Sequence, residues 1–260
     1  MTHLALGISQ LGPAAGLLRS RGGGIVLPPA YTAATDDLFV AWPGYVYSDT
    51  AGTTLLTSAG NARGWRSLRG TLASSNANVA WDGVDTLTHT GSQVWDIPAL
   101  VAIAQNATAL TVAAVAGYTA VTGAPLFVST NTLFAARAVI TASSATSFDF
   151  VGGRRLDADS SQLVSASATC TAARQVQLGV LDWANALATS RRNGAETTGA
   201  FQTAGATSNT ASAAVTLGGS ALGGMTGPLS AAWFAPARAF DATQRASNAA
   251  ALGALFGITW

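Results

Sequence analysis

The sequence contains no lysine, a single glutamate and a single cysteine. Its thirteen basic residues are all arginines, which are scattered along the chain and nearly balance eleven aspartates and Glu196. Without a basic stripe, the charge pattern does not indicate a nucleic-acid partner. One cysteine, Cys170, excludes an internal disulfide framework. Because His3 and His89 are the only histidines, we expect Cys170 to be a small buried side chain rather than a nucleophile.

Targeting and metal-binding patterns are also absent. The first residues lack a charged segment followed by an apolar run, and no stretch approaches eighteen consecutive apolar residues. These features predict a protein made in the bacterial cytoplasm without a signal peptide and without membrane insertion. The acidic residues do not show the spacing of a calcium loop, and the histidines and the cysteine do not show that of a zinc site. We therefore expect no metal and no cofactor.

What is present is a high content of short apolar runs. Hydrophobic residues make up 49% of the 260 residues, which argues against disorder and provides for a core. The runs recur at intervals near ten residues with turn residues between them, a pattern typical of an all-β sandwich. Expected strands are residues 38–42, 45–47, 79–90 around a turn at 82–83, 109–118, 125–130, 133–140, 147–151, 162–168, 187–192, 213–217 and 229–236. A loop is expected at 60–70 and a short helix at 96–106.

The stretch 176–199 is the most informative. Val176, Leu178 and Val180 alternate with smaller residues, while Leu181 and Trp183 place apolar groups on the opposite face. A strand that is apolar on both faces lies inside a layered sheet. The dipeptide at 193–194, Asn-Gly, favours a tight hairpin turn to the strand that follows.

A short helix is predicted to close the chain. Asp241 and Gln244 have the spacing of a capping box. Leu252, Leu255 and Phe256 form an apolar edge, and the glycine that follows them ends the helix.

Residues 1–29 differ from the rest, and we expect a single globular β domain at 30–260 to follow them. They contain a run of three glycines at 22–24 and two prolines at 28–29, the composition of a linker. The segment is extended and too short for its own core, and its apolarity favours docking onto another protein. The residues that we expect to make this attachment are Leu4, Leu6, Ile8, Leu11, Leu17 and Leu18.

One motif and the order of the expected elements resemble those of a known family of domains. The sequence WDGVDTL at 81–87 is similar to the aromatic-Asp-Gly-x-Asp element of laminin-G-like, concanavalin-A-like jelly-roll domains. As in those domains, it is followed by a long strand, an Asn-Gly hairpin, a strand that ends in Leu-Gly, and a last strand that runs into a capped helix. The resemblance covers residues 36–260 and implies an antiparallel jelly-roll sandwich with a short C-terminal helix.

An apolar, glycine-rich segment before such a domain resembles virion appendage proteins of tailed bacteriophages and gene transfer agents, which act as spikes, fibres or adhesins. The resemblance implies a virion location, attachment to other virion proteins through residues 1–29, homo-oligomeric assembly, and binding of host cell-surface polysaccharide. The alternative is a purely architectural capsid or tail decoration protein that has no glycan ligand.

Two clusters have the composition of a sugar-binding site, in which an aromatic face stacks on the ring beside planar hydrogen-bonding groups. An indole ring in either cluster can equally belong to the core. The first cluster is Trp65 with Arg63 and Arg66, and the second is Asp182, Trp183, Asn185 and Arg191.

Catalysis is not indicated, although some glycoside hydrolases and polysaccharide lyases are also jelly rolls. Glycoside hydrolysis generally needs two carboxylates, and Glu196 has no second glutamate near it. Asp82 and Asp85 lie in a turn, where capping is their ordinary role. His89 is expected to be an ordinary strand residue, exposed or bonded to a backbone carbonyl, and the glycine-rich stretch 218–227 a flexible loop. We therefore predict a protein that is not an enzyme.

Overall fold

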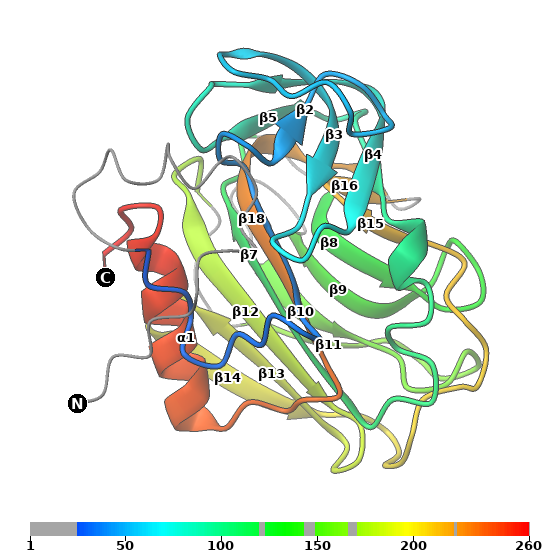
Figure 1. Cartoon of the computed structure of the whole chain (residues 1–260). Helices are drawn as coiled ribbons and strands as arrows, with labels where there is room; N and C mark the ends of the chain where they lie inside the picture. Colours follow the sequence, from blue (N-terminus) through cyan, green and yellow to red (C-terminus); the bar gives the residue numbers. More distant parts are fainter. Residues whose placement is uncertain (1–24, 120–122, 143–148, 166–170, 221–222, 260) are drawn as a thin grey trace.

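A computed structural model describes residues 25–119, 123–142, 149–165, 171–220 and 223–259, and this part of the chain is almost entirely β-structure (Figure 1). The elements are β1 (Asp37–Val40), β2 (Val46–Tyr47), β3 (Gly60–Arg66), β4 (Leu72–Trp81), β5 (Leu87–Thr90), β6 (Trp95–Asp96), the 3₁₀ turn η4 (Pro98–Leu100), β7 (Ala109–Ala116), β8 (Gly123–Ser129), β9 (Ala136–Ala142), β10 (Asp149–Gly153), β11 (Gln162–Val164), β12 (Gln175–Asp182), β13 (Leu187–Arg192), β14 (Ala195–Ala200), β15 (Val215–Leu217), β16 (Gly219–Ser220), β17 (Gly223–Gly224), β18 (Thr226–Pro236) and α1 (Ala242–Ala254).

The strands form two antiparallel layers, which confirms the predicted sandwich. One layer has the strand order β14-β13-β12-β7-β18, and β1 pairs with β18. The other layer has the order β11-β10-β9-β8-β15-β6-β4; β3 pairs with β4, and β2 pairs with β3. Strand β5 pairs with both β4 and β18 and so joins the two layers. Leu110 and Val112 of β7 meet Leu126 and Val128 of β8 in the core between the layers.

Strands β12, β13 and β14 follow one another as adjacent antiparallel strands. The predicted Asn-Gly turn joins β13 to β14, and Asn193 adopts a left-handed φ of 48° there. Val176, Leu178 and Val180 belong to the apolar cluster beneath the helix, whereas Leu181 belongs to the core between the layers. Strand β12 is therefore buried on both faces.

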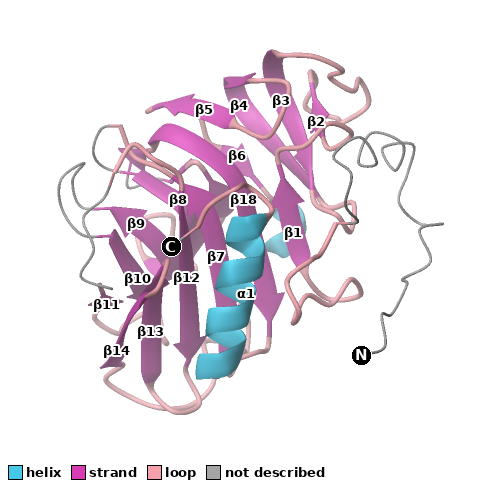
Figure 2. Cartoon of the chain, turned by 90° about the vertical axis from the view of Figure 1, so that its left-hand side faces the viewer, coloured by secondary structure: helices cyan, strands magenta, loops and turns pink. Residues whose placement is uncertain are grey.

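Helix α1 covers the outer face of this layer (Figure 2). The Asp241 carboxylate accepts a hydrogen bond from the backbone N–H of Gln244, and the Gln244 side chain accepts one from the backbone N–H of Asp241, so the predicted capping box is present. At the other end, the N–H of Ile258 bonds to the carbonyl of Gly253 across Gly257, whose φ is +68°. This Schellman motif ends the helix at the predicted glycine.

Four stretches differ from expectation. Residues 60–70 were expected to form a loop, but most of them form β3, paired with β4. At 96–106 the only helical element in the described chain is η4, because Asp96 belongs to β6 and pairs with Thr216 instead of capping a helix. Strand β9 begins at Ala136 rather than at residue 133. The described part of 218–227 includes a small hairpin of β16 and β17 rather than a flexible loop.

The described end of the predicted N-terminal segment is docked on the domain. Leu27 and Tyr31 pack against the apolar cluster beneath α1, and Pro28 is buried. The backbone N–H of Ala30 donates to Oδ1 of Asn248 on the helix at 2.8 Å. The prolines that suggested a linker therefore belong to the body of the domain. Cys170 and the six apolar attachment residues of the segment lie outside the described residues.

No helix in the described ranges is long and apolar enough to cross a membrane.

Candidate functional site

The two tryptophans that the sequence offers for sugar stacking are fully buried. The Trp65 indole N–H donates to the carbonyl oxygen of Val40 at 2.8 Å, and its ring packs edge-on against Phe39 and Trp95. Trp183 lies in the core between the layers, beside Phe201. Both rings are 0% exposed, so neither presents a face to a ligand in this structure.

The arginines next to Trp65 bind backbone carbonyls. Arg63 Nε donates to Ser75 O at 3.0 Å, and Arg66 Nη1 donates to Gly70 O at 2.8 Å. The Arg66 guanidinium also lies 5.6 Å from the centre of the Tyr47 ring. These contacts hold β3 against its neighbours, so the residues of the first predicted cluster stabilise the fold.

The second predicted cluster is divided between two places. The Asn185 amide donates to Asp182 at 2.8 Å in the turn after β12. Arg191 lies further along β13, where it forms an ion pair with Glu196 of β14 at 3.2 Å. Arg245 of α1 binds the same carboxylate, so Glu196 ties the helix to the sheet. The hydrogen bonds from Arg245 lower the pKa of Glu196.

The aspartates of the WDGVDTL element are also engaged. Asp82 Oδ1 accepts hydrogen bonds from the backbone N–H groups of Val84, Asp85 and Thr86 at 2.8, 3.0 and 3.0 Å. Asp85 forms an ion pair with Arg174 at 2.6 Å. Asp82 therefore has the capping role that its place in a turn predicts, whereas Asp85 joins the turn to Arg174.

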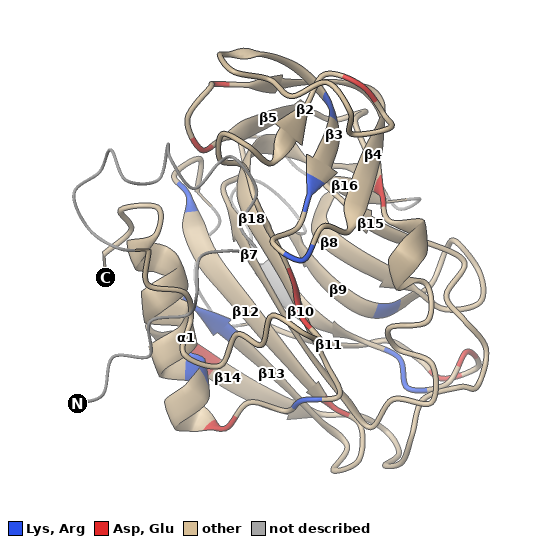
Figure 3. Cartoon of the chain, in the orientation of Figure 1, with Lys and Arg blue, Asp and Glu red and all other residues tan. Residues whose placement is uncertain are grey.

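Charged residues of both signs are interspersed over the two layers (Figure 3). Among the described residues, no group of three or more histidine, cysteine, aspartate or glutamate side chains is placed to hold a metal ion. The charges accordingly do not define a site, and the loops provide a better candidate.

Loops converge at one end of the sandwich, and we call residues 98–106, 130–135, 154–161 and 201–214 the loop end. At its centre is Arg137 of β9, whose side chain is fully buried. Arg137 donates to the carbonyl oxygens of Ala104 and Ser208, both at 3.4 Å, and forms an ion pair with Asp157. Burial lowers the pKa of Arg137, and the Asp157 carboxylate opposes that shift. The guanidinium thus pins three of the loops to one another.

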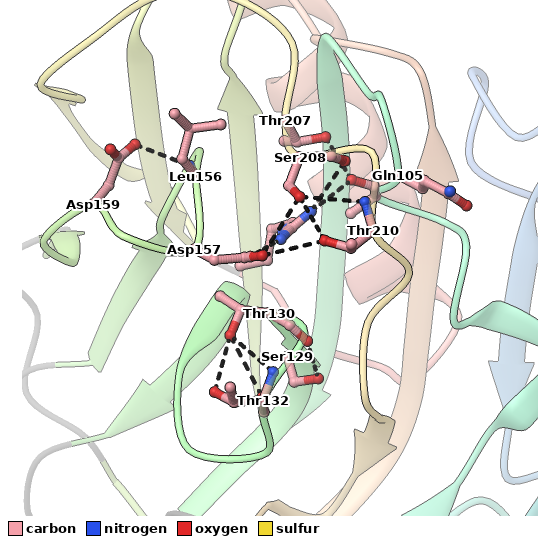
Figure 4. A network of polar contacts seen from close by, with 12 residues as sticks. Gln105, Ser129, Thr130, Thr132, Leu156, Asp157, Asp159, Thr207, Ser208 and Thr210 are labelled. Atoms are coloured by element: carbon pink, nitrogen blue, oxygen red, sulfur yellow. Dashed lines mark hydrogen bonds and ion pairs between the residues drawn. The ribbon is translucent and has the colours of Figure 1, made fainter.

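Asp157 gathers further polar groups at the surface of the loop end (Figure 4). The hydroxyl groups of Ser208 and Thr210 lie 3.4 and 3.2 Å from its Oδ2. Thr207 bonds both to the N–H of Ala107 and to the 98–106 loop. The result is a cross-linked polar surface in which Asp157 retains 25% side-chain exposure.

The β8–β9 hairpin loop is fixed beside this surface. Its Thr130 N–H donates to Ala135 O at 2.7 Å, and its Thr132 N–H donates to the Thr130 hydroxyl at 3.3 Å. The N–H of Ala213 donates to the carbonyl of Thr130 at 2.8 Å, which joins the hairpin to the 201–214 loop. A short hairpin held by this many bonds presents its tip in a defined position.

Phe134 at this tip is the site residue that sequence reasoning missed. It is 73% exposed, and its neighbour Leu133 is 47% exposed, whereas every other described phenylalanine or tryptophan for which burial is given is at most 9% exposed. The sequence placed Phe134 inside a strand because residues 133–140 are apolar at every position except Arg137. The turn residues at 131–132, Asn-Thr, were the available signal for a loop.

Comparisons with known proteins support the fold. The chain matches no protein-family model and no curated protein. A Trypanosoma rangeli sialidase in complex with 2,3-difluorosialic acid matches 97% of this chain and 39% of its own, at 12% identity and a TM-score of 0.56. The CBM40 domain of Ruminococcus gnavus IT-sialidase, bound to α2,3-sialyllactose, matches 64% of this chain and 96% of its own, at 13% identity and a TM-score of 0.51.

The likeness defines the class of fold. The chain is an antiparallel β-sandwich whose fold is similar to that of the CBM40 domain. It spans between 27% and 39% of the length of the sialidase chains that it resembles.

Proposed function

We propose that this chain is a glycan-binding domain that does not cleave its ligand. One observation carries the proposal: 64% of this chain matches 96% of a CBM40 domain whose structure contains bound α2,3-sialyllactose. In the larger sialidase neighbour, by contrast, this chain corresponds to only 39% of the protein. Fold and size together favour binding as the activity of the domain.

The carboxylates support binding over hydrolysis. A glycosidase generally needs one carboxyl group that stays protonated and a second one across the sugar ring. Glu196 is held ionised between two arginines, which lowers its pKa and makes it a poor general acid. Asp82 and Asp85 are occupied by backbone amides and by Arg174. These acids serve the fold.

We extend the proposal to a virion appendage, in which residues 1–29 attach the chain to other virion proteins and the sandwich binds host cell-surface polysaccharide. The support is the resemblance of an apolar, glycine-rich segment followed by a jelly roll to such appendages. Deletion of residues 1–24 tests it, because the deletion leaves the docked residues from Leu27 onward in place. Particles that still incorporate the shortened chain would contradict attachment through this segment.

The glycan-binding proposal is tested with the full chain on an array of neutral and sialylated oligosaccharides. We expect retention of a defined subset, and no release of reducing ends when the purified protein is incubated with the same glycans. A folded protein that binds none of them, yet still enters particles, would favour the architectural alternative. Turnover of any glycan would show an enzyme.

A further inference from the structure

We propose that Phe134 is the sugar-stacking surface of this domain, and that the polar groups around Asp157 and Thr210 bind hydroxyl groups of the same sugar. The ligand class is a neutral hexopyranose, whose ring has an apolar C–H face. This inference rests on the proposed glycan-binding function and adds the site and the chemistry of the ligand.

The exposure of Phe134 is the first argument. Removing a phenylalanine side chain from water is strongly favourable, and elsewhere this fold buries its described aromatic side chains wholly or in part. An aromatic ring with 73% of its surface exposed at a loop tip is available to a ligand. Sugar rings present C–H groups on one face and hydroxyl groups around the edge, and such a face matches a single exposed ring.

Rigidity is the second argument. The hairpin that carries Phe134 is closed by the Thr130–Ala135 bond and joined to the next loop through Ala213. The backbone N–H of Ala214 also donates a hydrogen bond to the hydroxyl oxygen of Ser129 at 2.8 Å. A ring whose supporting loop is already ordered loses less conformational entropy when a ligand stacks on it.

The polar neighbours supply the third argument. Arg137 of β9 lies three residues after Phe134 and bonds to Asp157 of the 154–161 loop, so the β8–β9 hairpin and the carboxylate lie at the same end of the sandwich. Asp157 accepts from the hydroxyls of Ser208 and Thr210, and a carboxylate has more acceptor sites than these bonds use. Thr210 is exposed, and so are Gln105 and Asn209 beside it. These groups offer both acceptors and donors to sugar hydroxyls.

Charge selects the ligand class. An acidic sugar needs a cation that can reach its carboxylate. Arg137 is fully buried and already paired with Asp157. The two partly exposed arginines of the 154–161 loop are also engaged, since Arg154 donates to Ser161 and Arg155 donates to Thr203 and Ala206. The partly exposed carboxylate of Asp157 would repel a second negative charge. A neutral hexopyranose therefore fits the loop end better than a sialic acid.

The test compares the full chain with three variants, F134A, F134Y and L163A. Leu163 is 48% exposed on β11 and is the matched control for removal of an exposed apolar side chain. For the neutral glycan that the unaltered chain binds best, we expect F134A to weaken binding about tenfold or more, because the stacking surface is lost. F134Y and L163A should bind as the unaltered chain does. Thermal unfolding should be the same in F134A as in the unaltered chain, since Phe134 packs little in the fold.

The outcomes separate the two proposals. An unaltered chain that binds no glycan overturns the proposed function, and this inference with it. Glycan binding that survives F134A overturns the inference alone. Binding restricted to sialylated glycans overturns the neutral ligand class, even where F134A weakens it.

Discussion

The indole N–H of Trp95 donates a hydrogen bond to Nε2 of His89 at 3.0 Å, and both side chains are buried. An indole nitrogen can only donate, so Nε2 must carry a lone pair and the imidazole must be neutral. Burial favours the same state and lowers the pKa of His89 to about 4. The sequence predicted an ordinary strand histidine, either exposed or bonded to a backbone carbonyl; the structure places His89 in β5 and rules out the exposed alternative, since the side chain is buried and accepts from Trp95.

Acid should therefore destabilise the protein through His89. The pKa is 6.5 in an unfolded chain and about 4 in the fold, so the unfolded state binds more protons between these values. The contribution of neutral His89 to the free energy of unfolding is fully present above pH 6.5 and is lost progressively as the pH falls toward 4. The shift corresponds to about 3 kcal/mol. Urea unfolding at pH 7 and at pH 4.5 measures the loss.

The variant H89Q isolates this contribution. A glutamine keeps an acceptor for Trp95 but does not titrate. The free energy of unfolding of H89Q should therefore change less between pH 7 and pH 4.5 than that of the unaltered chain. An equal pH dependence in H89Q and the unaltered chain would assign the effect to other groups.

Gly218 should resist substitution more than Gly257. Their φ angles are +69° and +68°, so alanine meets the same backbone strain at both positions, about 1 kcal/mol. A Cβ at Gly218 would lie 2.2 Å from His89 Nε2, whereas a Cβ at Gly257 would meet nothing within 4 Å. G218A should therefore cost several kcal/mol more than G257A in urea unfolding. Equal costs would show that the backbone at Gly218 moves freely away from His89.

Replacing the two buried tryptophans by phenylalanine should have unequal effects. Trp65 loses its bond to Val40 in W65F, while the Trp183 indole nitrogen is buried without a partner among the described residues. W65F should be more destabilising than W183F by about 1 kcal/mol, the net contribution of one buried hydrogen bond. Guanidinium unfolding of both variants measures the difference. If W183F were the costlier change, the Trp183 nitrogen would have to hold a bound water or another partner.

E196Q should loosen the helix from the sheet. Glu196 bonds to Arg191 and Arg245, and its pKa is lowered from the usual 4.5, so the pairs stabilise the fold above that pH and fade as the pH falls below it. At pH 7 we expect a loss of about 1 kcal/mol, as for a partly exposed ion pair. The control is T197V on the exposed face of the same strand. A loss in E196Q that persisted unchanged at pH 3.5 would contradict an electrostatic origin.

Much of the fold was readable in the sequence because its signals are local. The alternation around Val176 predicted strand β12, the Asn-Gly turn at Asn193 predicted the β13–β14 hairpin, and Asp241 with Gln244 predicted the start of α1. Strand β3 was missed because most of its residues are polar or glycine, and pairing with β4 holds it extended. The start of a strand within a mostly apolar run is equally hidden, which is why the predicted strand at 133–140 included Phe134.

The candidate site could not be predicted for a related reason. Whether a tryptophan faces solvent depends on the layer packed over it, and that layer comes from residues distant in sequence. Trp65 is covered by Phe39 and Trp95, and Asp157 meets Thr210 from another loop. Composition suggested a sugar-binding site, but only the structure shows which aromatic ring is accessible.

The hydrogen bond between Ala30 and Asn248 places the start of the domain on a different side from the β8–β9 hairpin. It fastens the entering chain to the closing helix on one flank of the sandwich, and the β8–β9 hairpin lies away from that flank (Figures 1 and 2). A load pulling on the entering segment would therefore act first on the helix flank. The β8–β9 hairpin, on the other side of the sandwich, would stay outside the path of that force.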